Sequence, residues 1–118
     1  MDKNLKFLVT RKGATEPPFS GEYNNNKEEG FYNCVNCGTM LFSSKHKFDS
    51  GTGWPSFYNI VSKSCIKEKN DKSHGMTRTE VQCSKCNSHL GHVFNDGPLP
   101  TGLRYCINSV ALSFKKST

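Results

Sequence analysis

"TEVQCSKCNSHLGHVF", residues 79–94, places a Cys-x-x-Cys pair between two short apolar and β-branched pieces. A second pair, "CVNC" at residues 34–37, ends the aromatic piece "FYNC". Two residues between thiolates let one tight turn present both sulfurs to a tetrahedral ion. We therefore predict one closed, structural zinc site per chain, with four ligands: Cys34, Cys37, Cys83 and Cys86.

Gly38 and Asn87, directly after the two pairs, suit the tight turns that such a site requires. Two separate redox dithiols, or disulfides in a secreted protein, are the alternatives. The N-terminal "MDKNLKFLVT" is too short and too polar for a signal peptide. We therefore expect a cytoplasmic protein, whose thiols stay reduced.

Outward from the two pairs, the chain consists of short apolar pieces separated by turn residues. The pieces are "FYNC", "MLF", "FYNIV", "TEVQC", "HVF" and "YCINSVALSF". Their spacing and their β-branched and aromatic content predict an antiparallel, all-β domain. The stretch "KEKNDKSHG", residues 67–75, is the most loop-like internal segment.

The length of 118 residues suits one domain, and we divide it into an N-terminal arm, residues 1–14, and a single domain, residues 15–118. The arm is expected to be a short helix or an extended segment. Only 34% of the residues are hydrophobic and the mean hydropathy is −0.64, so a small core stapled by metal is unsurprising. No apolar run approaches the roughly 18 residues of a membrane span.

The net charge of +6 raises the question of a nucleic-acid partner. The lysines cluster at the two ends and in residues 63–72, and they are not interleaved with aromatic residues. This pattern favours a solvated basic surface and no nucleic-acid partner. We also expect no membrane association and a monomeric protein.

Cys65 and Cys106 are left over from the predicted zinc site. A lone cysteine is most often a small buried hydrophobic residue. However, "RYCINS" around Cys106 occurs together with "GTGWPSF" at 51–57 and "HLGHVFNDGP" at 89–98, which bring the only tryptophan and two histidines.

These motifs, with "TEPPFSG", "CVNCGTMLF" and "SHGMTRTEVQC", make the chain resemble the B-type methionine sulfoxide reductases, the MsrB family. The resemblance covers nearly all of the chain after residue 14, in order. It implies two small antiparallel sheets packed together, with zinc away from the active site. It also implies a peptide-methionine (R)-S-oxide reductase, an oxidoreductase that repairs oxidised proteins under oxidative stress.

By this resemblance Cys106 is the nucleophile, and it passes through a sulfenic acid that thioredoxin or a similar thiol reductant recycles. His89, His92 and Asn108 are implied as polar groups that bind the sulfoxide oxygen or orient water. Trp54 would pack against the substrate methyl group, and Arg104 is the nearest cation in sequence. Since a free cysteine has a pKa of roughly 8.5, we expect the site to lower the pKa of Cys106.

The sequence departs from the family at Thr52, where many members carry a resolving cysteine. Cys65 is the only other free thiol, and it is a candidate resolving residue with a packing or surface role as the alternative. A similar zinc-held β fold also serves in non-enzymatic chaperones of small GTPases, so a binding module is the alternative function. Such a module would have no need for Cys106, His89, His92 and Trp54 together.

Overall fold

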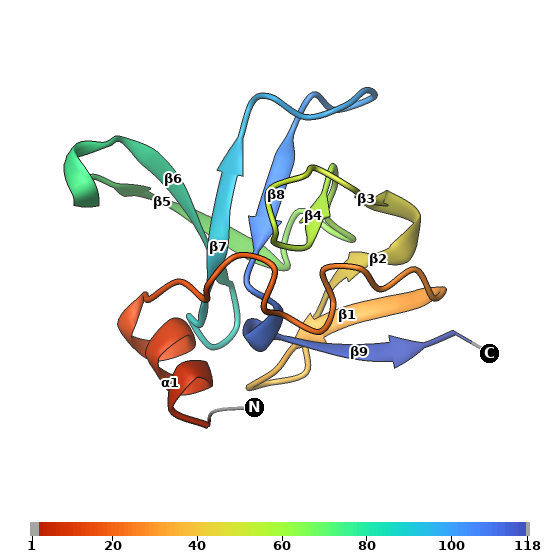
Figure 1. Ribbon diagram of the computed structural model, residues 1–118, viewed down its shortest axis with the longest axis horizontal. Coiled ribbons are helices and arrows are strands. Elements are labelled where there is room, and N and C mark those ends of the chain that lie inside the picture. Colours follow the sequence, from red (N-terminus) through yellow and green to blue (C-terminus); the bar gives the residue numbers. More distant parts are fainter. Residues whose placement is uncertain (1–2, 118) are drawn as a thin grey trace.

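The computed structural model describes residues 3–117 and contains one α-helix, nine strands and three short 3-10 helices within that range (Figure 1). The helices are α1 (Lys3–Lys12), η1 (Ser44–His46), η2 (Ser73–Gly75) and η3 (Ser109–Ala111). The strands are β1 (Gly30–Cys34), β2 (Met40–Ser43), β3 (Lys47–Phe48), β4 (Ser56–Phe57), β5 (Ile66–Asp71), β6 (Arg78–Cys83), β7 (His89–Phe94), β8 (Arg104–Ile107) and β9 (Leu112–Lys116).

The strands form two antiparallel sheets, which confirms the predicted mainly β fold. The smaller sheet has the order β2-β1-β9, and the larger one has the order β3-β4-β8-β7-β6-β5. "YCINSVALSF" is divided between them, because η3 separates β8 in the large sheet from β9 in the small one. Figure 1 shows the two sheets meeting where β8 passes into η3.

The core lies between the sheets and is rich in aromatic rings. Phe42 of the small sheet stacks on Phe57 of the large one, with ring centroids 4.4 Å apart, and Tyr32 meets Phe57 edge-on at 5.1 Å. All three side chains are fully buried. Such aromatic pairs add to the free energy gained by burial, so they hold the two sheets together.

Helix α1 occupies the N-terminal arm and packs against β7 and η3. Val9 is its buried anchor, and Gly13, with φ +74°, ends the helix in the left-handed conformation. Arg11 donates to the carbonyl oxygen of Cys86 at 2.8 Å. The helix therefore supports the turn between β6 and β7. No helix within residues 3–117 has the length and apolar character of a membrane span.

Two local predictions from the sequence are wrong. The supposed loop at residues 67–75 is strand β5 as far as Asp71, paired in register with β6. This strand is at the edge of its sheet, and its exposed lysine and glutamate side chains are typical of edge strands, which avoid apolar faces. The piece "FYNIV" is a strand only at Phe57, because β4 ends there.

Candidate active site and cysteine cluster

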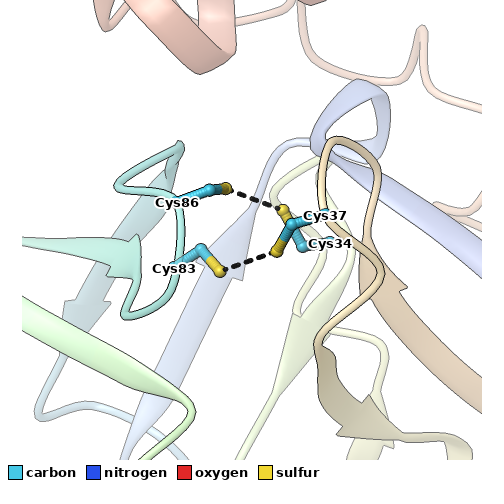
Figure 2. A group of neighbouring side chains, drawn as sticks. All are labelled: Cys34, Cys37, Cys83 and Cys86. Atoms are coloured by element: carbon cyan, nitrogen blue, oxygen red, sulfur yellow. Dashed lines mark hydrogen bonds between the residues drawn. The ribbon is translucent and has the colours of Figure 1, made fainter.

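Two tight turns bring the four cysteines of the predicted metal site together (Figure 2). Cys34 ends β1 and Cys83 ends β6, and Cys37 and Cys86 lie in the turns that follow. Each turn closes with a backbone hydrogen bond of 2.8–2.9 Å, to Cys34 and to Cys83. Gly38 and Asn87 have φ values of +82° and +62°, as their residue types predicted.

The sulfur positions fit a tetrahedral metal ion. Cys34 and Cys86 sulfurs are 3.6 Å apart, and those of Cys37 and Cys83 are 3.5 Å apart. All four sulfurs lie within 4.8 Å of one another. Four thiolates at about 2.3 Å from a zinc ion would be about 3.8 Å apart, so the cluster could hold such an ion.

The thiols of the cluster differ in their tendency to ionise. Burial raises the pKa of Cys34 to about 12. Burial also acts to raise the pKa of Cys86, but hydrogen bonds from Ser88 and from neighbouring thiols outweigh it and lower the pKa to about 6. The protein alone therefore does not hold four thiolates, and a cation is the group that would do so.

Cys106 lies in a second region, near the middle of β8. Its partner in register on β7 is His92, and its partner on β4 is Ser56. The thiol lines a cavity of about 290 Å³ together with other polar and aromatic side chains. They include Thr52, Trp54, Arg78, His92, Arg104 and Asn108.

Burial raises the pKa of the Cys106 thiol more than Thr52, Arg104 and Ser56 lower it. The prediction that the site lowers this pKa is therefore wrong. The physical reason is that a sulfur largely removed from water is harder to ionise. Hydrogen-bond donors and one cation oppose that cost without overcoming it.

Both predicted histidines are buried, but only His92 lines the cavity. His92 Nε2 is 2.7 Å from Asp71 Oδ2, and His89 Nδ1 is 2.7 Å from Glu80 Oε2. Burial lowers the pKa of His92, while Asp71 acts to raise it. The imidazole of His92 is thus oriented by a carboxylate from the edge strand.

The two rings meet at an angle of 70° with centroids 5.5 Å apart. Residues three apart on a regular strand point to opposite faces. Here the β6–β7 register shifts between Val81 and Gln82, which adds one residue to β7 between the histidines. Because of this bulge, the His89 ring lies next to the His92 ring, although only His92 lines the cavity.

Two further pocket residues are held by the segment before residue 20. The backbone N–H of Glu16 donates to Asn108 Oδ1, and Trp54 Nε1 donates to the carbonyl oxygen of Glu16, each at 2.9 Å. The buried carboxylate of Glu16 accepts from the N–H of Val110 at 3.0 Å. Glu16 thus fixes the indole and the amide with respect to each other.

Arg104 is held in place by a bidentate ion pair with Asp96, at 2.9 and 3.1 Å. Its guanidinium lies 4.4 Å from the centre of the Phe94 ring. Arg78 also lines the cavity, and it contacts Asp71 at 3.4 Å. The pocket therefore presents two guanidinium groups and an imidazole near one thiol, which suits a substrate with a partly negative oxygen.

Cys65 lies elsewhere. It directly precedes β5, is buried, and its thiol contacts the carbonyl oxygen of Leu41 at 3.7 Å. It belongs to the core cluster with Tyr105, whereas Cys106, the next residue on β8, lines the cavity. Adjacent strand residues point to opposite faces of a sheet, so the two free thiols lie on different sides of β8.

Sequence reasoning missed several of the polar residues that support the pocket. Glu16, Arg78 and Glu80 lie inside motifs that carried the resemblance, yet no role followed from their types alone. The sequence does not indicate a role for Asp71, because the charged segment that contains it has the composition of a loop. Its position opposite Arg78 on β6 was the signal that a correct strand assignment would have provided.

These features define a class of protein. It is a small, mainly β domain with four clustered cysteines that could hold a metal ion, and with one separate thiol in a pocket that contains cationic side chains. The family model described as the SelR domain matches residues 3–116. Curated relatives named peptide methionine sulfoxide reductase MsrB are similar along most of the chain. That of Synechococcus sp. (strain RCC307) is 58% identical over 96% of this chain and 83% of its own. That of Pseudomonas fluorescens (strain Pf0-1) is 62% identical over 91% and 82%.

The chain therefore belongs to the MsrB family, and its activity is the reduction of methionine sulfoxide in peptides. Among solved structures, the Mis18 "Yippee-like" domain has a TM-score of 0.61 and 17% sequence identity. The match covers 77% of this chain and 99% of that one. At this identity the likeness concerns the fold alone.

Proposed function

We propose that the protein reduces the R epimer of methionine sulfoxide in oxidised proteins and peptides, with Cys106 as the nucleophile. The observation that carries this proposal is the position of Cys106. It is the only cysteine among the side chains that line the 290 Å³ cavity, where it faces Trp54, His92 and two arginines. A binding module would not need a thiol in this position.

The proposed reaction begins when the Cys106 sulfur attacks the sulfoxide sulfur while a proton is delivered to the sulfoxide oxygen. A bond forms between the two sulfurs as the S–O bond of the substrate breaks, and the oxygen leaves as water after it takes up a second proton. Water then attacks the Cys106 sulfur and breaks the S–S bond, so that methionine leaves and Cys106 becomes a sulfenic acid. The thiol thereby loses two electrons and the substrate gains them. Two thiols of a reductant then restore Cys106, forming one disulfide and one water.

Each polar or aromatic side chain of the pocket has a separate role in the proposed reaction. His92 in its protonated form, oriented by Asp71, is the proposed proton donor, with the His89 ring next to it. Arg104 and Arg78 provide positive charge for the oxygen. Asn108 retains one N–H, because its Nδ2 bonds Leu90 and its Oδ1 accepts from Glu16. The Trp54 ring would contact the substrate methyl group, which fixes the epimer when the oxygen faces the donors.

The cysteine cluster has a separate, structural role in this proposal. Cys34, Cys37, Cys83 and Cys86 would hold one zinc ion, whose four-thiolate shell has no open position for a substrate. The ion would tie the end of β1 in the small sheet to the end of β6 in the large one. Zinc would thus stabilise the arrangement of the two sheets between which the core is packed.

Recycling by an external reductant such as thioredoxin is the route that the geometry supports. Cys65 lies at the start of β5, which is three strand spacings from β8, or roughly 14 Å in a flat sheet. A disulfide needs Cα atoms within about 7 Å. We propose a monomer in a thiol-reducing compartment such as the cytosol, where such a reductant and a free Cys65 persist.

The direct test supplies one peptide with either epimer of methionine sulfoxide and dithiothreitol as reductant. We expect turnover of the R epimer and no measurable turnover of the S epimer. A single turnover without reductant should leave sulfenic acid on Cys106, trapped by dimedone and located by peptide mass spectrometry. Equal turnover of both epimers would contradict the proposed stereochemistry, and an unmodified Cys106 would contradict the mechanism.

A further inference from the structure

A chain of hydroxyl groups connects Cys106 with the backbone of Trp54. Thr52 Oγ1 lies 3.8 Å from Cys106 Sγ and 2.8 Å from Ser50 Oγ. Ser50 Oγ is 2.7 Å from Ser56 Oγ, which donates to the carbonyl oxygen of Trp54 at 3.1 Å. The contacts are thus continuous from the reactive sulfur to the main chain of the residue proposed to bind the substrate methyl group.

These hydroxyl groups approach the Cys106 sulfur from the side of β4. Ser56 is fully buried and is the register partner of Cys106 across β4 and β8, so its side chain lies beside the thiol. Ser50 and Thr52 belong to the preceding turn, which Asp49 holds through the N–H of Gly51 at 2.9 Å. Fixed hydroxyls therefore take the place of solvent around this side of the sulfur.

The available protons allow the hydrogen bonds along these hydroxyl groups to point either toward the Cys106 sulfur or away from it. Each hydroxyl has one proton to donate and can accept two hydrogen bonds. When Cys106 is a thiol, S–H can donate to Thr52, and the hydroxyls of Thr52, Ser50 and Ser56 can each donate to the next group, ending at the Trp54 carbonyl. When Cys106 is a thiolate, Thr52 can rotate to donate to sulfur and accept from Ser50.

We propose that Thr52, Ser50 and Ser56 form a reversible hydrogen-bond chain that stabilises the Cys106 thiolate. Thr52 contacts the reacting sulfur and acts as a catalytic residue, whereas Ser50 and Ser56 are positioning residues that act through it. The inference rests on the proposed role of Cys106. It gives Thr52 a chemical function of its own.

Other charged and titratable groups also face Cys106. Arg104 lies on the same strand, His92 on β7 and Arg78 on β6, and Asp96 and Asp71 pair with these cations. None of these five side chains hydrogen-bonds Thr52 or Ser50 in the described part of the chain. A substitution in the hydroxyl chain therefore leaves these ion pairs unchanged.

The test measures ionisation of Cys106 in the zinc-loaded, reduced protein. Alkylation by iodoacetamide is followed from pH 6 to pH 11, and modification of Cys106 is quantified by peptide mass spectrometry. Thr52→Val keeps the shape of the side chain and removes the hydroxyl, so it should raise the pKa by about one. Thr52→Ser, which keeps the hydroxyl, should restore most of the wild-type value.

Ser50→Ala, which does not touch the sulfur, should raise the pKa by a few tenths. This effect should disappear when Thr52 is already valine, because the chain is then broken at its first member. Ser62→Ala removes a member of the exposed Ser62–Ser64 hydroxyl pair and is the matched control. Circular dichroism of every variant verifies the fold.

An unchanged pKa in Thr52→Val, or a Ser50→Ala effect that adds fully to it, would overturn the inference. The measurement needs no turnover, so it is independent of the proposed function. A protein that shows these shifts but does not reduce methionine sulfoxide through Cys106 would contradict the proposed function and leave the hydroxyl chain standing.

Discussion

The cysteine cluster and the Cys106 pocket use the same functional group in opposite ways. In the cluster, four sulfurs from two tight turns lie within 4.8 Å of one another. In the pocket, one sulfur is surrounded by hydroxyl, imidazole and guanidinium groups. Four converging thiolates are a stable set of metal ligands, and coordination removes their reactivity. A single sulfur kept apart from other thiols stays available for attack on a substrate.

Strand β7 connects the two regions. Its first residue, His89, follows the cluster turn, and its fourth, His92, is the register partner of Cys106. The separation along the strand is roughly 10 Å, at about 3.3 Å per residue. Loss of a cluster cysteine is therefore expected to disturb the pocket as well, because it destabilises the whole fold. A substitution in the pocket should leave the cluster intact.

The largest expected effect comes from removing one cluster ligand. Cys83→Ser should lose the metal and the cooperative thermal transition, because structural zinc sites contribute on the order of 10 kcal/mol of folding free energy. That figure is comparable to the whole stability of a small domain. Zinc content by atomic emission and melting by circular dichroism measure the two losses. Cys65→Ser, which alters a buried thiol outside the cluster, is the control and should retain one zinc ion per chain.

Cys106→Ser should produce the opposite pattern. Turnover of methionine-R-sulfoxide should fall by more than roughly 10⁴-fold, because the proposed nucleophile is lost. The zinc content should not change, and the melting temperature should stay within about 3 °C, since a small polar replacement fits the pocket. Appreciable turnover in this variant would remove Cys106 from the mechanism, and loss of zinc would contradict the independence of the two regions.

The contrast between the regions also explains what the sequence could predict. The cluster depends on two local spacings and on residue types after each pair, so Gly38 and Asn87 were predictable from chain-local rules. The pocket is lined by β6, β7, β8 and the segment before β4, and it is supported by the segment around Glu16. A local rule does not bring such distant segments together, so the resemblance to a family, and not the spacing of residues, indicates its main residues.

The remaining errors have particular physical causes. Asp71 was assigned to a loop because an exposed edge strand rich in charge has no apolar alternation to reveal it. The contact between the His89 and His92 rings depends on a bulge in β7, and the three-residue spacing of the histidines in the sequence does not specify it. The pKa of Cys106 depends on how deeply β8 is buried, and that is a property of the packed sheets.

A smaller effect should appear when Asp71, which supports the pocket, becomes asparagine. Burial lowers the folded-state pKa of His92, so its stabilising contribution is present above the ordinary value of about 6.5 and is lost as the pH falls. Asp71 acts to raise this pKa. Asp71→Asn should therefore lower it further and increase the stability lost between pH 6.5 and 4.5 by about 1 kcal/mol.

Urea unfolding at the two pH values measures this difference. The Asp71 carboxyl itself does not titrate in that window, because hydrogen bonds from His92 and Ser73 hold its pKa well below the usual range. Asp96→Asn is the matched control, since it removes a carboxylate that pairs with the pocket residue Arg104 instead of with His92. Equal pH dependence in Asp71→Asn and the wild type would show that this carboxylate does not control His92.

The smallest expected effect concerns Cys65, the remaining thiol. Cys65→Ser should retain most thioredoxin-supported turnover, because the thiol lies in the core on the other side of β8 from Cys106. Burial also raises the pKa of Cys65, which reduces the thiolate needed to attack a sulfenic acid. The assay compares thioredoxin with dithiothreitol as reductant for the same variant. Retention of dithiothreitol activity with loss of thioredoxin activity would instead make Cys65 the resolving cysteine. It would also require β5 to move during each turnover, because three strand spacings exceed the reach of a disulfide.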